Sequence, residues 1–353
     1  MRFDPKSQIG NLTAKLREIA LGRDTTTASD AVADVLENGE AGNIGVINTR
    51  DAAVKAFITD YKNNPMGTVI VTYNKETNNN VESVKSLNNA VRTQLHPEAI
   101  DRIIDGDVIV AYSTYEKKNI FGNIEAKIAN SERMKVRSAE APSTKTISIV
   151  EKFRGKETVH RFEIETQTVT LTDGVKVEVM TKKAKAKYNE LVKEYRGEAQ
   201  NKIFTNYSRY KALLRIPTEM VLNAEFGYVI TAHKSQGQSF ENVYAMLDNL
   251  NGIPTTNGSK RNKNAAIYVA MSRSKKKLIV VAKGLPNKSV NLGNEQLQKE
   301  SNLESVKEFP ELATAIKDEL SKLYPEINAK ELDTVLDHYG NEVLGKTING
   351  AIE

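Results

Sequence analysis

The sequence predicts an α/β protein in which a parallel-sheet domain is interrupted by a small antiparallel β module and followed by a helical C-terminal extension. Three observations lead to this prediction. Apolar strand-like runs alternate with helical periodicity over residues 44–95, which is the pattern of a parallel sheet. Residues 105–181 hold strand-like segments bounded by glycines, as in antiparallel structure. Near Phe226 the alternation returns, so the simplest topology inserts the β module in one α/β domain.

These changes of pattern divide the chain into five segments. We expect the first part of the α/β domain at residues 1–104 and the β-rich insert at 105–181. A helical return segment follows at 182–225, then the second part of the α/β domain at 226–290 and an acidic helical extension at 291–353.

The first segment shows both strand and helix signals. Leucine and isoleucine at helical spacing predict a helix over residues 7–37. Two short apolar runs follow, at 44–48 and 68–72, and each leads into a stretch with apolar residues on one helical face. A continuous apolar run is what a strand buried on both faces requires. We therefore expect two parallel strands, each followed by a helix.

The later segments are predicted in the same way. In the insert we expect strands at 108–112, 123–128, 145–153, 158–165 and 169–180, with turns marked by glycines at positions 122, 155 and 174. A helical region follows at 182–215. Apolar strands are then expected at 226–231 and 278–282, and a helix end at 267–272.

Composition restricts the classes of function. The 353 residues include no cysteine, which excludes disulfides, thiolate metal sites and thiol nucleophiles. No apolar run approaches the roughly 20 residues of a membrane-spanning helix, and the N-terminus has no apolar signal-peptide core. We therefore expect no membrane association and a cytoplasmic location.

Charge is spread unevenly along the chain. From Asn291 onward there are thirteen Asp or Glu and six Lys or Arg, so the residues before Asn291 carry a net charge of +12. A basic body with an acidic tail suits a polyanionic partner for the body. A plain solvated surface would give the same pattern, so charge alone leaves both interpretations open.

Two motifs carry candidate chemistry. The first is Tyr228-Val-Ile-Thr-Ala-His-Lys-Ser-Gln-Gly-Gln-Ser-Phe240, a predicted strand that ends in a tight polar loop. The loop would bring a hydroxyl, an imidazole and backbone amides to the carboxyl edge of the sheet, where open α/β sheets bind ligands. The second is Tyr268-Val-Ala-Met-Ser-Arg273, followed by lysines. A guanidinium held there can reach a phosphate that another domain presents.

Together these motifs resemble motifs V and VI of superfamily 1 DNA helicases, especially the RecD-like and Dda-like branch. The motif V pattern, Thr-x-His-Lys-x-Gln-Gly, matches residues 231–237. The motif VI pattern, Tyr-Val-Ala-x-Thr-Arg, matches residues 268–273 with Ser272 in place of Thr. The segment Thr72-Tyr-Asn-Lys75 resembles the Thr-x-Asn-Lys strand exit of the family. The resemblance covers about residues 1–290 and implies a RecA-like motor domain with an SH3-like insert.

The resemblance implies a role for each matched residue. Arg273 would be the arginine finger that stabilises charge on the transferring γ-phosphoryl group, and Arg2 would be a second γ-phosphate contact. The nucleotide side of the cleft would be lined by Gln236, Gly237 and Ser239. Single-stranded DNA would be contacted by Thr231, His233, Lys234, Thr72, Asn74 and Lys75. ATP and Mg²⁺ would be the cofactors, and no ligand spacing predicts a metal site in this chain.

The sequence contains no Gly-x-x-x-x-Gly-Lys-Ser/Thr loop (Walker A) and no strand that ends in an Asp-Glu pair (Walker B), the motifs that hold nucleotide phosphates and magnesium. We therefore expect little ATP hydrolysis by this chain alone, and a requirement for a first motor domain, upstream or on a partner chain, that holds most of the ATP and Mg²⁺. An expressed fragment, a split gene or a degenerate homologue would each explain the absence.

Two competing hypotheses are a non-catalytic single-stranded DNA-binding or regulatory subunit, and an adaptor whose acidic tail recruits replication or recombination proteins.

Overall fold

The computed structural model describes residues 7–38, 42–73, 82–118, 121, 123–153, 156–200, 204–254 and 260–285. The chain divides into two compact units, residues 1–290 and 291–353, and all described residues belong to the first unit. The candidate residues Arg2, Asn74 and Lys75 lie outside the described residues, as does the predicted helical extension.

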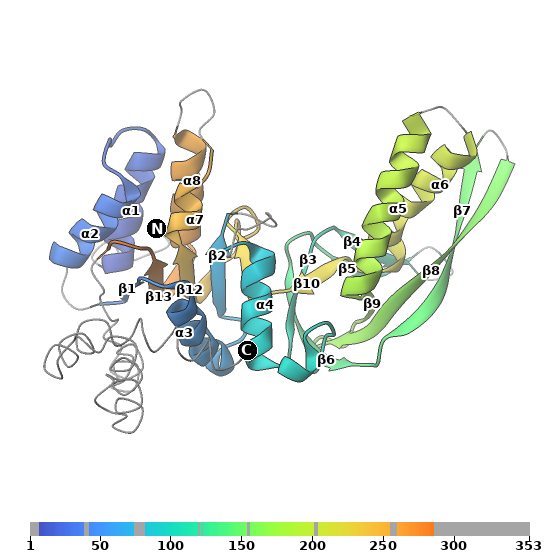
Figure 1. Ribbon diagram of the computed structural model, residues 1–353, viewed down its shortest axis with the longest axis horizontal. Helices are drawn as coiled ribbons and strands as arrows, with labels where there is room; N and C mark the ends of the chain where they lie inside the picture. Colours follow the sequence, from blue (N-terminus) through green and yellow to red (C-terminus); the bar gives the residue numbers. More distant parts are fainter. Residues whose placement is uncertain are drawn as a thin grey trace, which may run out of the picture. The chain divides into compact units, whose positions relative to one another are not determined.

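A five-stranded parallel sheet forms the centre of one half of the first unit (Figure 1). Its strands are β1 (Ile44–Ile47), β2 (Thr68–Thr72), β11 (Val229–Thr231), β12 (Phe240–Met246) and β13 (Ser274–Val281). Their spatial order is β1-β13-β12-β2-β11, and every neighbouring pair is parallel. The predicted α/β fold class, with a parallel sheet, is confirmed.

Helices cover both faces of this sheet. They are α1 (Gln8–Ala20), α2 (Ala28–Asn38), α3 (Arg50–Asn63), α4 (Val84–Leu95), α7 (Leu247–Asn251) and α8 (Arg261–Met271). Successive strand residues point to opposite faces, so Val69 and Val71 pack with α1, α2 and α8, whereas Ile70 packs with α3 and α4. Burial on both faces is the reason for the continuous apolar runs. None of the helices within the described ranges is long and apolar enough to cross a membrane.

The helix predicted over residues 7–37 is two helices, α1 and α2. Gly22 has a φ of 72° just after α1, a conformation that glycine adopts without steric cost and that commonly ends a helix. Asp24 then accepts a hydrogen bond from the backbone N–H of Thr26 at 2.8 Å. The prediction was wrong because apolar residues continue at helical spacing on both sides of the break, and both helices face the same core.

The insert is antiparallel, as predicted. Its strands are β3 (Val108–Ala111), β4 (Tyr115–Lys118), β5 (Ile124–Ile128), β6 (Arg133–Ala139), β7 (Ser143–Phe153), β8 (Lys156–Leu171), β9 (Lys176–Met180) and β10 (Ala224–Phe226). One sheet has the order β10-β3-β6-β8-β7 with β9 also on β8, and β4 and β5 form a separate hairpin. The structure adds β4, β6 and β10, which the sequence analysis did not predict; Phe226 ends β10, so the strand predicted over 226–231 begins only at Val229, as β11.

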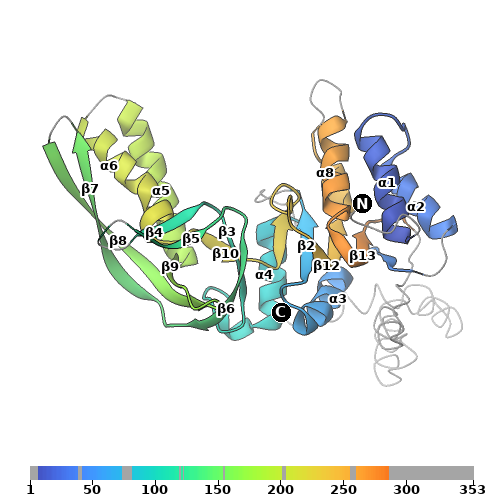
Figure 2. The same cartoon turned by 180° about the vertical axis from the view of Figure 1, so that it is seen from behind.

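The predicted strand over residues 169–180 is interrupted. Its first residues complete the long strand β8, and β9 begins at Lys176 after a turn. Gly174 has a φ of 91° in this turn, and Asp173 accepts a hydrogen bond from Val175 N at 3.0 Å. Beyond β9, the helices α5 (Lys182–Gln200) and α6 (Phe204–Arg215) pack against β7 and β8 through a shared apolar cluster (Figures 1 and 2).

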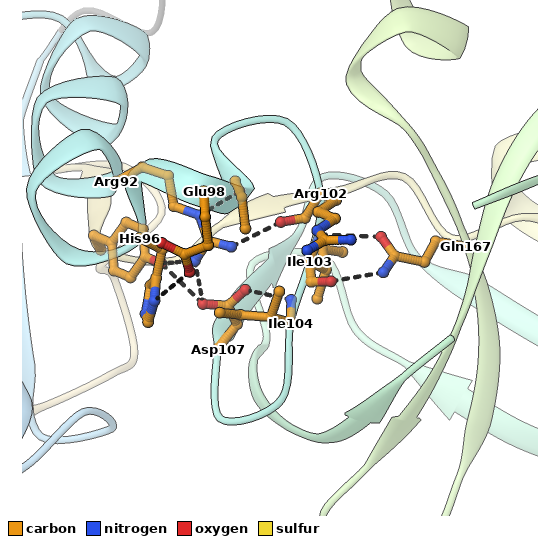
Figure 3. A network of polar contacts seen from close by, with 10 residues as sticks. Arg92, His96, Glu98, Arg102, Ile103, Ile104, Asp107 and Gln167 are labelled. Carbon is orange, nitrogen blue, oxygen red and sulfur yellow. Dashed lines mark hydrogen bonds and ion pairs between the residues drawn. The ribbon is translucent and has the colours of Figure 1, made fainter. Parts of the chain in front are cut away.

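A buried ion pair joins the insert to the parallel-sheet domain (Figure 3). Arg92 of α4 contacts Asp107, which precedes β3, at 2.5 Å, and both side chains are at most 1% exposed. The hydroxyl of Tyr228 lies 3.0 Å from the same carboxylate. Arg92 also donates to the carbonyl oxygens of Ala99 and Arg102. The network therefore fixes the two places where the chain leaves and re-enters the parallel-sheet domain.

Arg133 of β6 provides a second connection. Its guanidinium is buried and donates to the carbonyl oxygens of Met66 at 2.8 Å, Thr68 at 3.0 Å and Gly227 at 3.1 Å. Burial lowers the pKa of Arg133 to about 10, so the side chain remains charged at neutral pH. It holds the insert against the amino ends of β2 and β11.

Candidate functional site

The candidate site begins at the carboxyl ends of β2 and β11. Thr72 and Thr231 are the last residues of these strands and are paired in register. Just beyond them, Ala232 N donates to Thr72 O at 2.8 Å. The structure therefore brings together two residues that are far apart in the sequence and that were both predicted to contact DNA.

The side chain of Thr72 is turned into the protein. It is fully buried, and its hydroxyl lies 2.7 Å from Glu82 O and 2.6 Å from Asn249 Oδ1. Asn249 Oδ1 also accepts a hydrogen bond from Tyr73 N at 2.9 Å. This geometry does not support the predicted DNA contact through the Thr72 hydroxyl, because that group already has internal partners. Thr72 instead shapes the end of the strand.

We predict that Thr72→Val, which keeps the shape of the side chain but removes its hydroxyl, lowers the free energy of unfolding by about 1–3 kcal/mol. The reason is that buried polar atoms of Glu82 and Asn249 lose a partner. Urea unfolding of the full chain measures the effect. Thr59→Val, at an exposed position of α3, is the matched control and should change the stability by less than about 0.5 kcal/mol. Equal effects of the two variants would contradict the prediction.

Two rings lie together beyond these strand ends. His233 is exposed, and its ring centroid is 6.5 Å from that of Tyr73. The Thr231 hydroxyl accepts a hydrogen bond from Lys234 N at 3.3 Å, which turns the chain immediately after His233. A solvent-facing imidazole beside a tyrosine can donate to a phosphate or stack on a base.

The electrostatics of this carboxyl edge are mixed. Helices α3 and α4 begin after β1 and β2, so their positive N-terminal ends point towards this edge. Arg50 and Lys283 follow β1 and β13. Two carboxylates also lie here: Asp248 accepts a hydrogen bond from Lys283 N at 2.9 Å, and Glu82 lies nearby. Burial, and then Asp248, raises the pKa of Glu82, while Lys283 and Arg50 act in the opposite direction.

The polar loop between β11 and β12 does not stay at the carboxyl edge. Thr231 ends β11 beside Thr72, whereas Phe240 begins β12 beside Ser274, the first residue of β13. Asn242 is already in register with Thr68, the first residue of β2. Residues 232–239 therefore run the length of β2 to its amino end. The sequence analysis placed the whole loop at the carboxyl edge, and this was wrong for its second half.

Arg273 lies at this amino edge, immediately before β13. Its Nε donates to Val269 O at 3.0 Å, and its two Nη atoms donate to Gln238 O at 3.3 Å and to the Ser272 hydroxyl at 3.0 Å. The backbone oxygen of Arg273 accepts a hydrogen bond from Phe240 N at 2.9 Å. The end of α8 and the polar loop thus hold a half-buried guanidinium between them.

The three residues predicted on the nucleotide side lie in the same part of the loop. Gln236 and Gly237 are exposed, and Ser239 is half-buried. Gly237 has a φ of 79°, and a Cβ at this position would meet no atom within 4 Å. Its glycine is therefore required by the backbone conformation and not by lack of space.

Lys234 faces the insert. Its ammonium group donates to Asn130 Oδ1 at 2.9 Å and to Ala111 O at 3.2 Å, and it lies 4.1 Å from the centroid of the Tyr112 ring. These contacts occupy the group that was predicted to bind DNA. The geometry instead makes Lys234 a link between the polar loop and the insert.

Sequence reasoning missed several residues of the site. Tyr73 occupies the variable position of the Thr-x-Asn-Lys segment, and Gln238 follows the motif V match at 231–237, so neither stood out. Asn249 gives no signal in the sequence because its role depends on its contact with β2.

Within the described part of the chain, no group of three or more His, Asp or Glu residues could hold a metal ion.

Comparison with protein families matches part of this region. Residues 226–281 match the UvrD-like helicase C-terminal domain. The matched range includes β11, the polar loop, β12 and Arg273. This segment is thus similar to the C-terminal portion of superfamily 1 helicases. No curated protein matches the chain significantly.

Solved structures of Pif1 helicases were also found. Two coordinating Pif1 helicases at forked double-stranded DNA share 13% identity at a TM-score of 0.31, with 85% of this chain and 52% of that chain covered. Bacteroides Pif1 with ADP-AlF3 and single-stranded DNA shares 13% identity at a TM-score of 0.30, with 85% of this chain and 54% of that chain covered. Candida albicans Pif1 shares 14% identity at a TM-score of 0.27, with 82% of this chain and 56% of that chain covered. The chain spans about half the length of these structures.

Proposed function

We propose that this chain supplies the second motor domain of an ATP-dependent DNA helicase of superfamily 1, on the RecD-like or Dda-like branch. With a first motor domain, from an upstream segment or a partner chain that carries the Walker A and B motifs, it would translocate on single-stranded DNA and unwind duplex DNA. The observation that carries the proposal is the course of residues 231–239. This one segment runs from the carboxyl edge, with Thr231 and His233, to the amino edge beside Arg273.

On the nucleotide side, the proposed role of Arg273 is to contact the γ-phosphate of ATP. A fork-shaped guanidinium suits this task because it can donate two parallel hydrogen bonds to phosphate oxygens. The exposed Gln236 and Gly237 would line the same cleft, with Ser239 beside them. Mg²⁺ and most of the phosphate contacts would come from the first motor domain, and Arg2 would add a further phosphate contact.

On the DNA side, the exposed His233 would contact the strand, with Tyr73 beside it and Thr231 fixing the turn. Asn74 and Lys75 would extend the contact beyond β2. The N-terminal ends of α3 and α4 favour anions at this edge. Closure of the two motor domains around ATP would shift residues 231–239 and thereby move the bound strand.

Binding of a labelled oligodeoxythymidine to the full chain, followed by fluorescence anisotropy, tests the DNA side. We expect the logarithm of the affinity to fall linearly with the logarithm of the salt concentration, by about 0.7 per phosphate contacted. We expect His233→Ala to weaken binding by roughly five- to thirtyfold, through loss of one charged or stacking contact. The matched control, His96→Ala, changes a histidine at the C-terminal end of α4 and should bind as the wild type does. Binding that ignores salt, or that survives His233→Ala unchanged, would contradict the proposal.

A second candidate function is a non-catalytic single-stranded DNA-binding subunit. The observation that favours it is that the proposed DNA contacts at the carboxyl edge come from this chain and do not involve Arg273, which lies at the amino edge. This alternative predicts that oligonucleotide binding needs no ATP and that Arg273→Ala leaves it unchanged. It also predicts no DNA-stimulated ATPase when the chain is combined with a first motor domain, which is the result that separates the two candidates.

A further inference from the structure

The turn between β5 and β6 has a well-defined backbone. Ser131 has a φ of 73°, a conformation that a non-glycine residue rarely adopts and that persists only when its surroundings enforce it. Its backbone N–H donates to Ala111 O at 3.0 Å. The Glu132 carboxylate accepts a hydrogen bond from Ala129 N at 2.7 Å and so closes the turn. The carbonyl oxygen of Ser131 is thereby held in a defined position.

Gln238 connects this turn to the candidate nucleotide side. Its side-chain amide nitrogen donates to Ser131 O at 2.7 Å and to Lys234 O at 2.9 Å. Both of its N–H groups are therefore used. Its own backbone oxygen accepts the hydrogen bond from Arg273 Nη1 at 3.3 Å. One residue thus contacts the insert, the polar loop and the guanidinium.

Lys234 holds the same loop at a second point. It contacts Asn130 in the turn and lies over the ring of Tyr112. The exposed Gln236 and Gly237 lie between the two attachment points. A displacement of the turn must therefore move the loop at both ends, and at Gln238 it moves an acceptor of Arg273 directly.

We infer that Gln238 is a positioning residue through which the inserted β module sets the orientation of Arg273. The role of Arg273 in this inference rests on the proposed function. A strand of DNA that pushes against the insert would then change how the guanidinium is held, without any contact between the DNA and Arg273. The side-chain amide of Gln238 is essential to this link because a carboxylate in its place cannot donate to Ser131 O.

The test is a double-mutant cycle on the full chain, without DNA or nucleotide, read out by NMR at the Nε–Hε group of Arg273. Arg273→Lys assigns the signal. Glu132→Ala loosens the turn without touching Gln238, and we expect it to shift the signal and to speed its exchange with solvent by between about twofold and tenfold. In a Gln238→Glu background, the same Glu132→Ala change should have a much smaller effect, because only the contact of Lys234 with the turn then remains. Glu140→Ala, at an exposed position of the insert, is the matched control and should leave the signal unchanged.

A shift of undiminished size in the Gln238→Glu background would overturn the inference, and so would no response to Glu132→Ala in the wild type. If Gln238→Glu does not fold, Gln238→Met, which has a similar length and no donor, replaces it. Oligodeoxythymidine binding is then measured on the same samples. Failure to bind DNA with the cycle intact would remove the proposed function and leave the link between the insert and Arg273 standing.

Discussion

Replacing Arg273 by alanine is expected to reduce DNA-stimulated ATP hydrolysis by about 10³–10⁵-fold in a complex of this chain with a first motor domain. Negative charge on the transferring phosphoryl group needs a cation in direct contact, and the neighbouring Gln236, Gly237 and Ser239 are neutral. Arg273→Lys keeps the charge but loses the planar fork, so we expect it to recover only part of the rate. Steady-state ATPase assays with saturating oligonucleotide measure both variants.

The controls separate a catalytic effect from a structural one. Arg273 contacts oxygens of Val269, Gln238 and Ser272 at a half-buried position, so its removal should cost about 1–3 kcal/mol of folding stability. Oligonucleotide binding should persist in Arg273→Ala. Arg23→Ala changes an exposed arginine paired with Glu18 and should retain full ATPase activity. An ATPase rate for Arg273→Ala within tenfold of the wild type would refute the arginine-finger role.

Arg92→Met is expected to lower the free energy of unfolding by about 3–5 kcal/mol, because it leaves the carboxylate of Asp107 buried without its cationic partner. This is a large share of the roughly 5–15 kcal/mol that stabilises a typical domain. Tyr228 cannot replace the lost cation, because burial, and then Asp107, raises the pKa of its hydroxyl and the group stays neutral. It can only donate one neutral hydrogen bond. Urea unfolding of the full chain, followed by circular dichroism, measures the loss.

The matched control is Lys127→Met. Lys127 forms an ion pair with Glu116 at 2.8 Å, with side chains 61% and 33% exposed, and such a surface pair contributes about 0–1 kcal/mol. The double variant Arg92→Met with Asp107→Leu should recover part of the loss, since no charge then remains buried. A loss below about 1 kcal/mol for Arg92→Met would show that the ion pair does not anchor the insert.

Four strands of the parallel sheet, all but β12, could be predicted from the sequence because a strand buried on both faces forms a continuous apolar run. The run over 68–72 is apolar at Val69, Ile70 and Val71, and each of these faces a core. The match to residues 226–281 also supports the helicase resemblance of the motif region. Break points inside periodic segments were harder to predict. Gly22 and Gly174 end elements through positive φ values, which a pattern of apolar residues does not report.

Side-chain orientation at the site could not be predicted in this way. Thr72 and Lys234 fit a DNA-binding pattern, yet the hydroxyl of one lies against Asn249 and the ammonium group of the other lies against Tyr112. Both partners are distant in the sequence. The functional assignments of His233 and Arg273 remain predictions that the experiments above test.

The sequence by itself determined the fold class, the antiparallel character of the insert and the residues that form the polar loop, because these depend on local periodicity and composition. The tertiary structure decided which edge of the sheet each residue occupies. The loop over 232–239 divides between the two edges because β11 and β12 lie on opposite sides of β2 and both run parallel to it. Strand order and register arise from contacts between distant segments, and those contacts place Thr231 and Arg273 at opposite ends of the same sheet.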